Sequence, residues 1–179
     1  GGPWTTITAG ITGTNHVWAV PNVSTTAGRI RASAYNGATW LYQDISDGDF
    51  TIQGSGHVNT PNGGEVLTGG GSHTITWSAY PGATSYTLAY STTGTGGPWT
   101  TIKTGVVGTS WNWSVPNVGT TAGRIRVSVY NGTTWLYQDL SDGDFTIQGS
   151  GYVISPNGGE TLTGLNSQAV TWRAYPGAT

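Results

Sequence analysis

The sequence repeats itself with a period of 95 residues, and this repeat limits the possible folds more than any other feature. The motif GGPWTTI occurs at residues 1–7 and 96–102, and PNGGE occurs at residues 61–65 and 156–160. Residues 1–84 align with residues 96–179 without a gap and are identical at 61 of 84 positions. Because a 95-residue unit has the size of one small sandwich, we expect each period to fold as one domain.

Apolar residues at every second position predict an all-β fold. Ile75, Trp77 and Ala79, for example, share one face of a predicted strand. Similar runs occur at residues 85–91, 111–115, 125–129 and 145–147, with short opening strands near residues 56–60 and 99–103. About seven strands in 95 residues is typical of an immunoglobulin-like antiparallel β-sandwich. The Asn-Gly of YNGTTW at residues 130–135 predicts a hairpin that joins the last two strands.

The period divides the chain into one complete sandwich and two partial ones. We expect residues 56–150 to be a complete repeat, residues 1–53 the C-terminal part of a first repeat, and residues 151–179 the N-terminal strands of a following one. Two readings follow from this division. The chain is either a window on a longer series of repeats, or a subunit whose last strands complete the first repeat of its neighbour, head to tail, into a fibre.

Composition argues against several classes of protein. The 179 residues carry 6 Lys and Arg and 8 Asp and Glu, a net charge of −2, so no basic surface for nucleic acid is expected. No run of eighteen apolar residues occurs, so we expect no membrane span. Cysteine is absent, which excludes disulfides and thiol nucleophiles. Low charge with abundant Thr and Ser favours an extracellular or cell-surface location.

The order of motifs resembles a known repeat family. PNGGE, ITW, GGPWTTI, WNWSVPN, RIRVSVY and SDGDFTI follow one another within one period. This order is similar to the immunoglobulin-like repeats of the Ser-Thr-rich, GPI-anchored cell-wall type, which occur in tandem in secreted and surface proteins. The resemblance implies an extracellular, modular architecture without catalytic residues. This sequence has neither the long Ser/Thr tail nor the anchor signal of the fungal members, so wall anchoring is not implied.

Acidic residues gather in QDISDGDF at residues 43–50 and in QDLSDGDF at residues 138–145. Together with a glutamate at the junction between two repeats, their oxygens are weak candidates for a calcium site, since Ca²⁺ takes six to eight oxygen ligands. These candidates are Asp139, Asp142, Asp144 and Glu160. The spacing is not that of an EF-hand, and turn formation with hydrogen bonds to local amides is the preferred interpretation. We therefore predict no metal and no cofactor.

Catalytic chemistry is not expected. The carboxylates of each repeat sit in one short turn rather than across a sugar cleft. His16, His57 and His73 are replaced in the other copy by Trp111, Tyr152 and Gln168, so ordinary packing or surface roles explain them better. Four arginines, at positions 29, 31, 124 and 126, fall on the solvent phase of their strands and suit cross-strand pairing and edge protection.

Aromatic residues and sequons are the remaining candidate sites. Five of the nine tryptophans lie on the core phase of their strands: Trp18, Trp77, Trp111, Trp113 and Trp172. The other four, Trp4, Trp40, Trp99 and Trp135, are free to contact sugar, a neighbouring domain or another chain. Asn22, Asn112 and Asn131 begin N-glycosylation sequons.

These observations predict a non-enzymatic extracellular structural protein. Near-identical tandem copies serve length and repeated presentation rather than catalysis, so we expect a subunit or segment of a filament or stalk, glycosylated where the source allows. The alternative is a carbohydrate-binding or adhesive module of a secreted enzyme.

Overall fold

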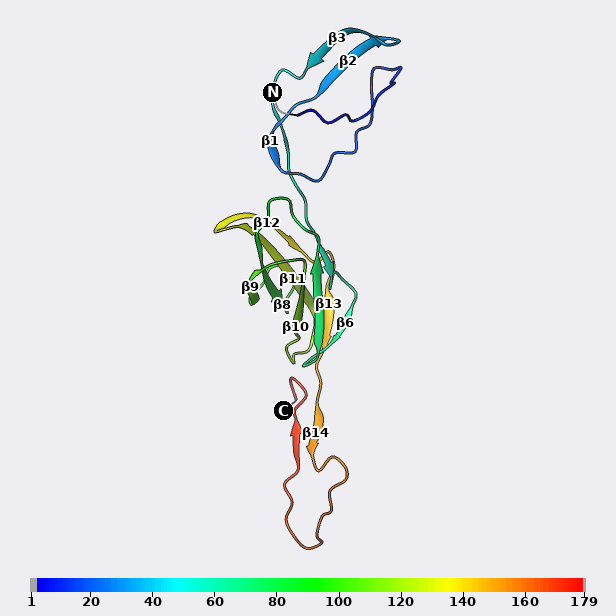
Figure 1. Cartoon of the computed structure of the whole chain (residues 1–179). Helices are drawn as coiled ribbons and strands as arrows, with labels where there is room; N and C mark the ends of the chain where they lie inside the picture. Colours follow the sequence, from blue (N-terminus) through cyan, green and yellow to red (C-terminus); the bar gives the residue numbers. More distant parts are fainter. Residues whose placement is uncertain (1–2, 179) are drawn as a thin grey trace. The chain divides into compact units, whose positions relative to one another are not determined.

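The computed structural model describes residues 3–178, and the chain divides into two compact units, Gly1–Ser55 and Gly56–Thr179. No helix among residues 3–178 has the length and hydropathy needed to cross a membrane. The strands are β1 (Thr25–Gly28), β2 (Arg31–Asn36), β3 (Thr39–Ile45), β4 (Phe50–Ile52), β5 (Val58–Thr60), β6 (Val66–Thr68), β7 (Ser72–Trp77), β8 (Ser85–Ser91), β9 (Thr100–Val106), β10 (Ser110–Ser114), β11 (Thr120–Asn131), β12 (Thr134–Leu140), β13 (Phe145–Gln148), β14 (Tyr152–Ser155) and β15 (Thr171–Arg173) (Figure 1).

Residues 56–150 form a sandwich of two sheets, which confirms the predicted all-β, immunoglobulin-like fold class (Figure 1). The smaller sheet has the antiparallel strand order β10-β7-β5. The larger sheet has the order β6-β13-β11-β8-β9, with β12 paired to β11. Its β6 and β13 are parallel, whereas its other pairs are antiparallel.

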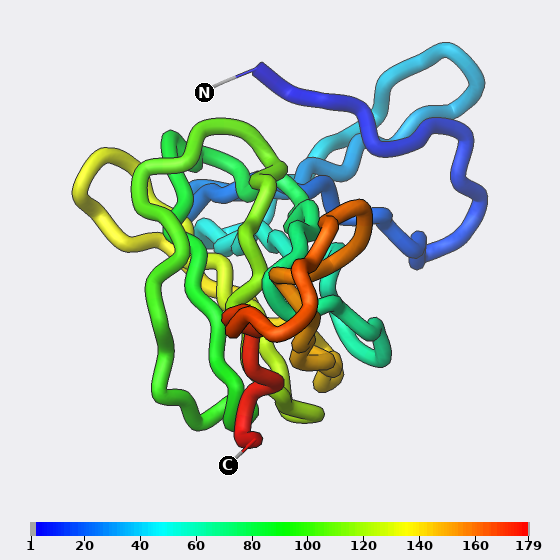
Figure 2. The backbone as a smooth tube through the Cα atoms, turned by 90° about the horizontal axis from the view of Figure 1, so that it is seen from below, coloured from blue at the N-terminus to red at the C-terminus, as the bar shows by residue number. Residues whose placement is uncertain are grey.

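Two details differ from the sequence prediction. Nine strands, rather than about seven, lie between Val58 and Gln148, because β6 and β12 add to the expected set. The Asn-Gly hairpin does form, and Figure 2 shows it as the yellow loop that stands out from the sandwich. Its return strand is β12, however, and not the last strand β13. β13 pairs instead with the beginning of β11, so one long strand serves two partners in turn.

The core lies between the two sheets and follows the predicted alternation. The smaller sheet contributes Ile75, Trp77 and Trp113, and the larger sheet contributes residues such as Leu88 and Phe145, all of them buried. The Trp113 and Phe145 rings meet edge to face, with ring centres 6.5 Å apart. Such a packed aromatic pair stabilises a core beyond its buried area by about 0.5–1.5 kcal/mol.

A glycine in β11 allows this aromatic pair to pack. The pairing of β11 with β13 is irregular between Thr120 and Gly123. A Cβ atom on Gly123 would lie 2.4 Å from Cε2 of the Phe145 ring, closer than atoms can approach. Gly28 stands in the same relation to Phe50, with a corresponding distance of 2.5 Å. The glycine at this position is therefore required by ring packing in both copies.

The remaining strands reproduce the pairings of their counterparts in the other copy. Hairpin β2–β3 pairs in the same register as β11–β12, and β1 pairs with β4 as the beginning of β11 pairs with β13. The β14–β15 pair opposes Val153 to Trp172, as β5 and β7 oppose Val58 to Trp77. The counterparts of β6, β9 and β10, at residues 161–163, 5–11 and 15–19, are not strands. These three strand pairings therefore repeat with the sequence, whereas those of β6, β9 and β10 do not.

Several expectations for single residues are corrected by the structure. Trp77 and Trp113 are buried as predicted, but Trp18 and Trp111 are only half-buried and Trp172 is exposed. Arg124 and Arg126 are also half-buried rather than on a free solvent face. Arg124 forms an ion pair with Asp144, and the guanidinium of Arg126 lies 4.7 Å from the centre of the Trp99 ring. Arg29 and Arg31 make the same two contacts in the other copy, with Asp49 and Trp4 respectively.

Substituting Gly123 by Ala is expected to destabilise the sandwich by about 1–3 kcal/mol, because the added methyl group would overlap the Phe145 ring. Native-state amide exchange at buried Ile125 and Val127 would measure this free energy of opening. Gly119→Ala is the matched control, since a Cβ there meets nothing within 4 Å. Equal protection in the two variants would contradict the packing argument.

Candidate functional site

The acidic candidates for calcium bind different protein partners and do not converge. Asp139 Oδ2 accepts a hydrogen bond from the Val58 amide at 2.8 Å, and Asp142 Oδ2 accepts one from Asn62 Nδ2 at 2.8 Å. Asp144 pairs with Arg124. Across residues 3–178, no three His, Cys, Asp or Glu side chains are grouped in a way that would hold a metal ion.

The junction glutamates each close a PNGGE loop. Glu65 accepts hydrogen bonds from the amides of Asn62 and Gly63, both at 2.7 Å. Glu160 accepts the corresponding bonds from Asn157 and Gly158 at 2.8 and 2.7 Å. Burial alone would raise the pKa of Glu65, but the amide hydrogen bonds outweigh burial, so the pKa lies below its ordinary value. The carboxylate form of Glu65 therefore stabilises the folded loop.

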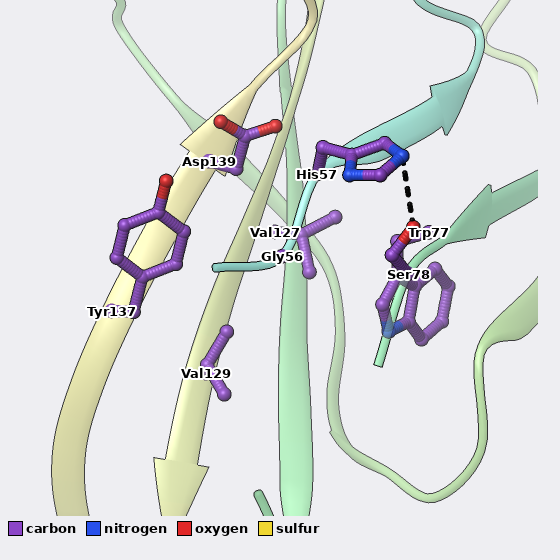
Figure 3. Close-up of a pocket in the computed structure, with 8 residues that line it drawn as sticks. All are labelled: Gly56, His57, Trp77, Ser78, Val127, Val129, Tyr137 and Asp139. Atoms are coloured by element: carbon purple, nitrogen blue, oxygen red, sulfur yellow. Dashed lines mark hydrogen bonds between the residues drawn. The ribbon is translucent and has the colours of Figure 1, made fainter. Parts of the chain in front are cut away.

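A small crevice brings together a serine, a histidine and an aspartate, which is the set of groups used in nucleophilic catalysis. Ser78 Oγ lies 2.9 Å from His57 Nε2, and Figure 3 shows the imidazole ring turned toward Ser78 and away from Asp139. Asp139 is engaged by the Val58 amide, so it does not orient the histidine. The cavity has a volume of about 10 Å³, which is close to the minimum for one water molecule and too small for a substrate.

The other copy shows what this pair does. The counterparts of His57 and Ser78 are Tyr152 and Arg173, which lie directly opposite each other on β14 and β15. The Arg173 guanidinium lies 6.0 Å from the centre of the Tyr152 ring. Two chemically different pairs therefore make a cross-strand contact at the same place, which is a structural role.

A larger, open depression of about 360 Å³ lies beside the edge strands β9 and β10. Tyr90, Ile102 and Trp111 supply its apolar walls, and Asn112 its polar rim. Lys103 Nζ lies 5.4 Å from the centre of the Trp111 ring. The sequence prediction assigned Trp111 to the core, whereas it stands at the rim of this depression. In the other copy, His16 replaces Trp111.

The four tryptophans predicted to be free fall into two pairs. Trp40 and Trp135 are more than half exposed on the two Asn-Gly hairpins. Trp4 and Trp99 instead stack against the guanidinium groups of Arg31 and Arg126, both at 4.7 Å. The hairpin pair is thus free to contact another molecule, whereas the other pair is partly committed to its own sheet.

The three sequon asparagines are all exposed, but they differ in their bonding. Asn22 Nδ2 donates to the Ser55 carbonyl at 2.9 Å, and its Oδ1 accepts from the Ser55 amide at 2.8 Å. Its side-chain amide group is therefore held by Ser55, which lies in the segment TIQGSG at residues 51–56, called the connector below. Asn112 lies on β10 and Asn131 ends β11.

The sequence analysis did not predict that the asparagine at this position of the repeat, Asn22 or Asn117, holds the backbone of a distant serine. We call this contact the connector clamp. Asn117, the counterpart of Asn22, makes the same two bonds to Ser150, both at 2.9 Å. Ser150 Oγ also donates to the Gly69 carbonyl at 2.6 Å. The sequence did contain a signal for this contact, because VPN and GSG recur together in both copies with the Asn and the Ser 33 residues apart. Asn after Pro, however, is also typical of a simple turn.

Replacing Asn117 by Ala is expected to lower the local free energy of opening at Ser150 by about 1–2 kcal/mol, because two hydrogen bonds to its peptide group are lost. Amide exchange at Ser150 would measure the change. Asn112→Ala is the control, since Asn112 is exposed on the adjoining strand. Unchanged exchange at Ser150 in the Asn117 variant would show that the clamp contributes nothing.

Glu65→Gln is expected to lower the free energy of unfolding at pH 7 and to make that free energy less sensitive to acid. Since the folded-state pKa of Glu65 is lowered, its stabilising contribution is complete above about pH 5 and is lost as the pH falls through the folded pKa. Amide exchange in β13 at pH 7 and pH 4 would measure both effects. Glu160→Gln, at the fully exposed counterpart, should leave β13 unchanged. An equal acid response of the parent and Glu65→Gln would refute the assignment.

Comparisons with known proteins assign the chain to no family. No protein-family model matches the chain, and no curated protein matches it. A solved structure of fibronectin(III)-like modules of Clostridium thermocellum CbhA is similar over 52% of this chain and 95% of its own, with 13% identity and a TM-score of 0.40. A TM-score this low does not establish a shared fold, so the immunoglobulin-like assignment rests on the strand order and core of this chain.

Proposed function

We propose that this chain is a non-enzymatic structural protein of the extracellular space, a subunit or segment of a filament or stalk built from tandem immunoglobulin-like repeats. The single observation that carries the proposal is the repetition of structure with sequence. The aromatic pair, the ion pair, the Arg–Trp stack and the connector clamp all occur twice, 95 residues apart.

The distribution of repeated and unrepeated contacts supports this function. The contacts that occur in both copies hold strands and connectors together. The Ser78–His57 pair and the depression at Trp111, in contrast, differ between the copies. A protein built for length needs the shared contacts in every repeat and tolerates variation at the other two places. The resemblance to repeats of the Ser-Thr-rich, GPI-anchored cell-wall type supports an extracellular location. The exposed sequons at Asn112 and Asn131 support glycans there, and we also propose head-to-tail self-association of the repeats.

The test is electron microscopy of the native material. We expect continuous fibres with an axial repeat of roughly 35–45 Å, the length of one sandwich with its connector. The 95-residue period predicts one such spacing per repeat. Discrete particles of one or two domains at every concentration would contradict a filament. Assays with general glycoside and peptide substrates should show no turnover.

A carbohydrate-binding or adhesive module of a secreted enzyme is the second candidate. The exposed Trp135 and the aromatic depression at Trp111 favour it, because aromatic faces stack on sugar rings. Saturable binding to a glycan array, lost in Trp135→Ala or Trp111→Ala with the fold intact, would establish this function in place of the first.

A further inference from the structure

The end of the complete sandwich at which the chain leaves it is held by hydrogen bonds. In the turn between β6 and β7, the Gly69 amide donates to the Gln148 carbonyl at 2.7 Å. The connector clamp of Asn117 fixes Ser150, whose hydroxyl donates to the Gly69 carbonyl beside the buried Gly149. We call this surface the end face, and it consists of Gly69, Gly70, Asn117, Gly149 and Ser150.

The strands that follow start directly at the end face. Tyr152 on β14 is paired with Arg173 on β15, and the same register continued by three residues brings Gly149 opposite Pro176. A Cβ atom on Gly149 would lie 2.7 Å from Cδ of Pro176. The proline ring therefore packs on the end face at a position where only a glycine leaves space for it.

The position of Pro176 is set by a local turn. The Ala178 amide donates to the Tyr175 carbonyl at 3.0 Å, and proline at the second position of such a turn has the required φ. The same turn forms in the complete repeat, where the Ala83 amide donates to the Tyr80 carbonyl at 3.1 Å. The repeated sequence thus places a proline ring just after this strand.

Arg173 makes a second contact, with the turn between β6 and β7. A Cβ atom on Gly70 would lie 2.8 Å from Nη1 of Arg173, so the half-buried guanidinium lies against the Gly70 backbone. The Gly70 amide donates to the Val115 carbonyl at 3.0 Å, which ties this turn to the sandwich. The pairing of β14 with β15 does not account for this contact, because Gly70 belongs to neither strand.

These contacts restrict how the following strands are oriented. Domains joined by a short link alone are expected to move relative to each other. Here the backbone leaves the sandwich at Ser150, while Pro176 packs on Gly149 and Arg173 packs on Gly70. Because the contacts lie on different elements of the end face, bending or twisting the strands about Ser150 would break at least one of them.

We infer that the end face of the complete repeat is a docking surface for the first strands of the next repeat, residues 152–178, so that the two form a packed joint with one preferred orientation. The inference deepens the proposed function, on which it rests, because a filament or stalk is stiff only where its repeats are joined in a defined orientation. The partner that the surface fits is a turn with a proline at its second position and a cation on the strand before it.

Residual dipolar couplings of the weakly aligned full chain test this joint. In the parent, the amides of β14 and β15 should report the same alignment tensor as those of the sandwich. Gly149→Ala places a methyl group against the Pro176 ring and should lower the alignment of β14 and β15 to roughly half that of the sandwich, because domains without a packed interface move independently. Gly164→Ala, between β14 and β15, is the matched control, since a Cβ there meets nothing within 4 Å.

A second variant tests the other contact. Arg173→Ser introduces the residue that the complete repeat has at position 78, and it removes the guanidinium from Gly70. It should lower the alignment of β14 and β15 in the same direction as Gly149→Ala. In Gly149→Ala the couplings within β14 and β15 should still fit the paired strands, which distinguishes a loosened joint from loss of the strand pair.

Two outcomes would overturn the inference. Different alignment tensors for the sandwich and for β14 and β15 in the parent would show a flexible link. Equal alignment in the parent and in both variants would show that these contacts do not set the orientation. Fibres seen by microscopy in either case would leave the filament intact and exclude only this joint, whereas a shared tensor without fibres would keep the joint and contradict the filament.

Discussion

Burial of aromatic side chains between the two sheets is the interaction on which the folded repeat depends. Trp77, Trp113 and Phe145 occupy the centre of the sandwich, and only 8% of the residues are charged, so few ion pairs are available to replace that burial. The requirement extends to the backbone, since Gly123 has to leave space for the Phe145 ring.

Much of the fold could be predicted from the sequence because the signals are local. Alternation located β7, β8, β10 and the middle of β11, and Asn-Gly located the hairpin. The return strand β12 was not predicted because Leu136 to Leu140 show no clear alternation, with neighbouring Leu136 and Tyr137 both half-buried. The three-residue β6 was missed because its order comes from parallel pairing with β13, about eighty residues away.

The candidate sites were less predictable than the fold. Trp111 has the phase of a core residue, yet its strand lies at the edge of a sheet, where that phase reaches solvent. Asn117 has the sequence context of a turn residue, and only the distant Ser150 gives it a role. The acidic turn was interpreted as backbone bonding within itself, whereas its carboxylates reach Val58 in β5 and Asn62 in the loop that follows β5. Each of these properties depends on tertiary neighbours that local patterns do not specify.

The parallel pairing of β6 with β13 has a mechanical consequence. β6 lies near the beginning of the repeat and β13 near its end, with Val66, Leu67 and Thr68 opposite Thr146, Ile147 and Gln148. When a repeat is pulled by its two ends, parallel strands at those ends slide along each other, so their hydrogen bonds are loaded together in shear instead of being opened one at a time. Forced unfolding is governed by the unfolding rate. A chain of such repeats would therefore resist tension most strongly along the direction in which the sequence runs.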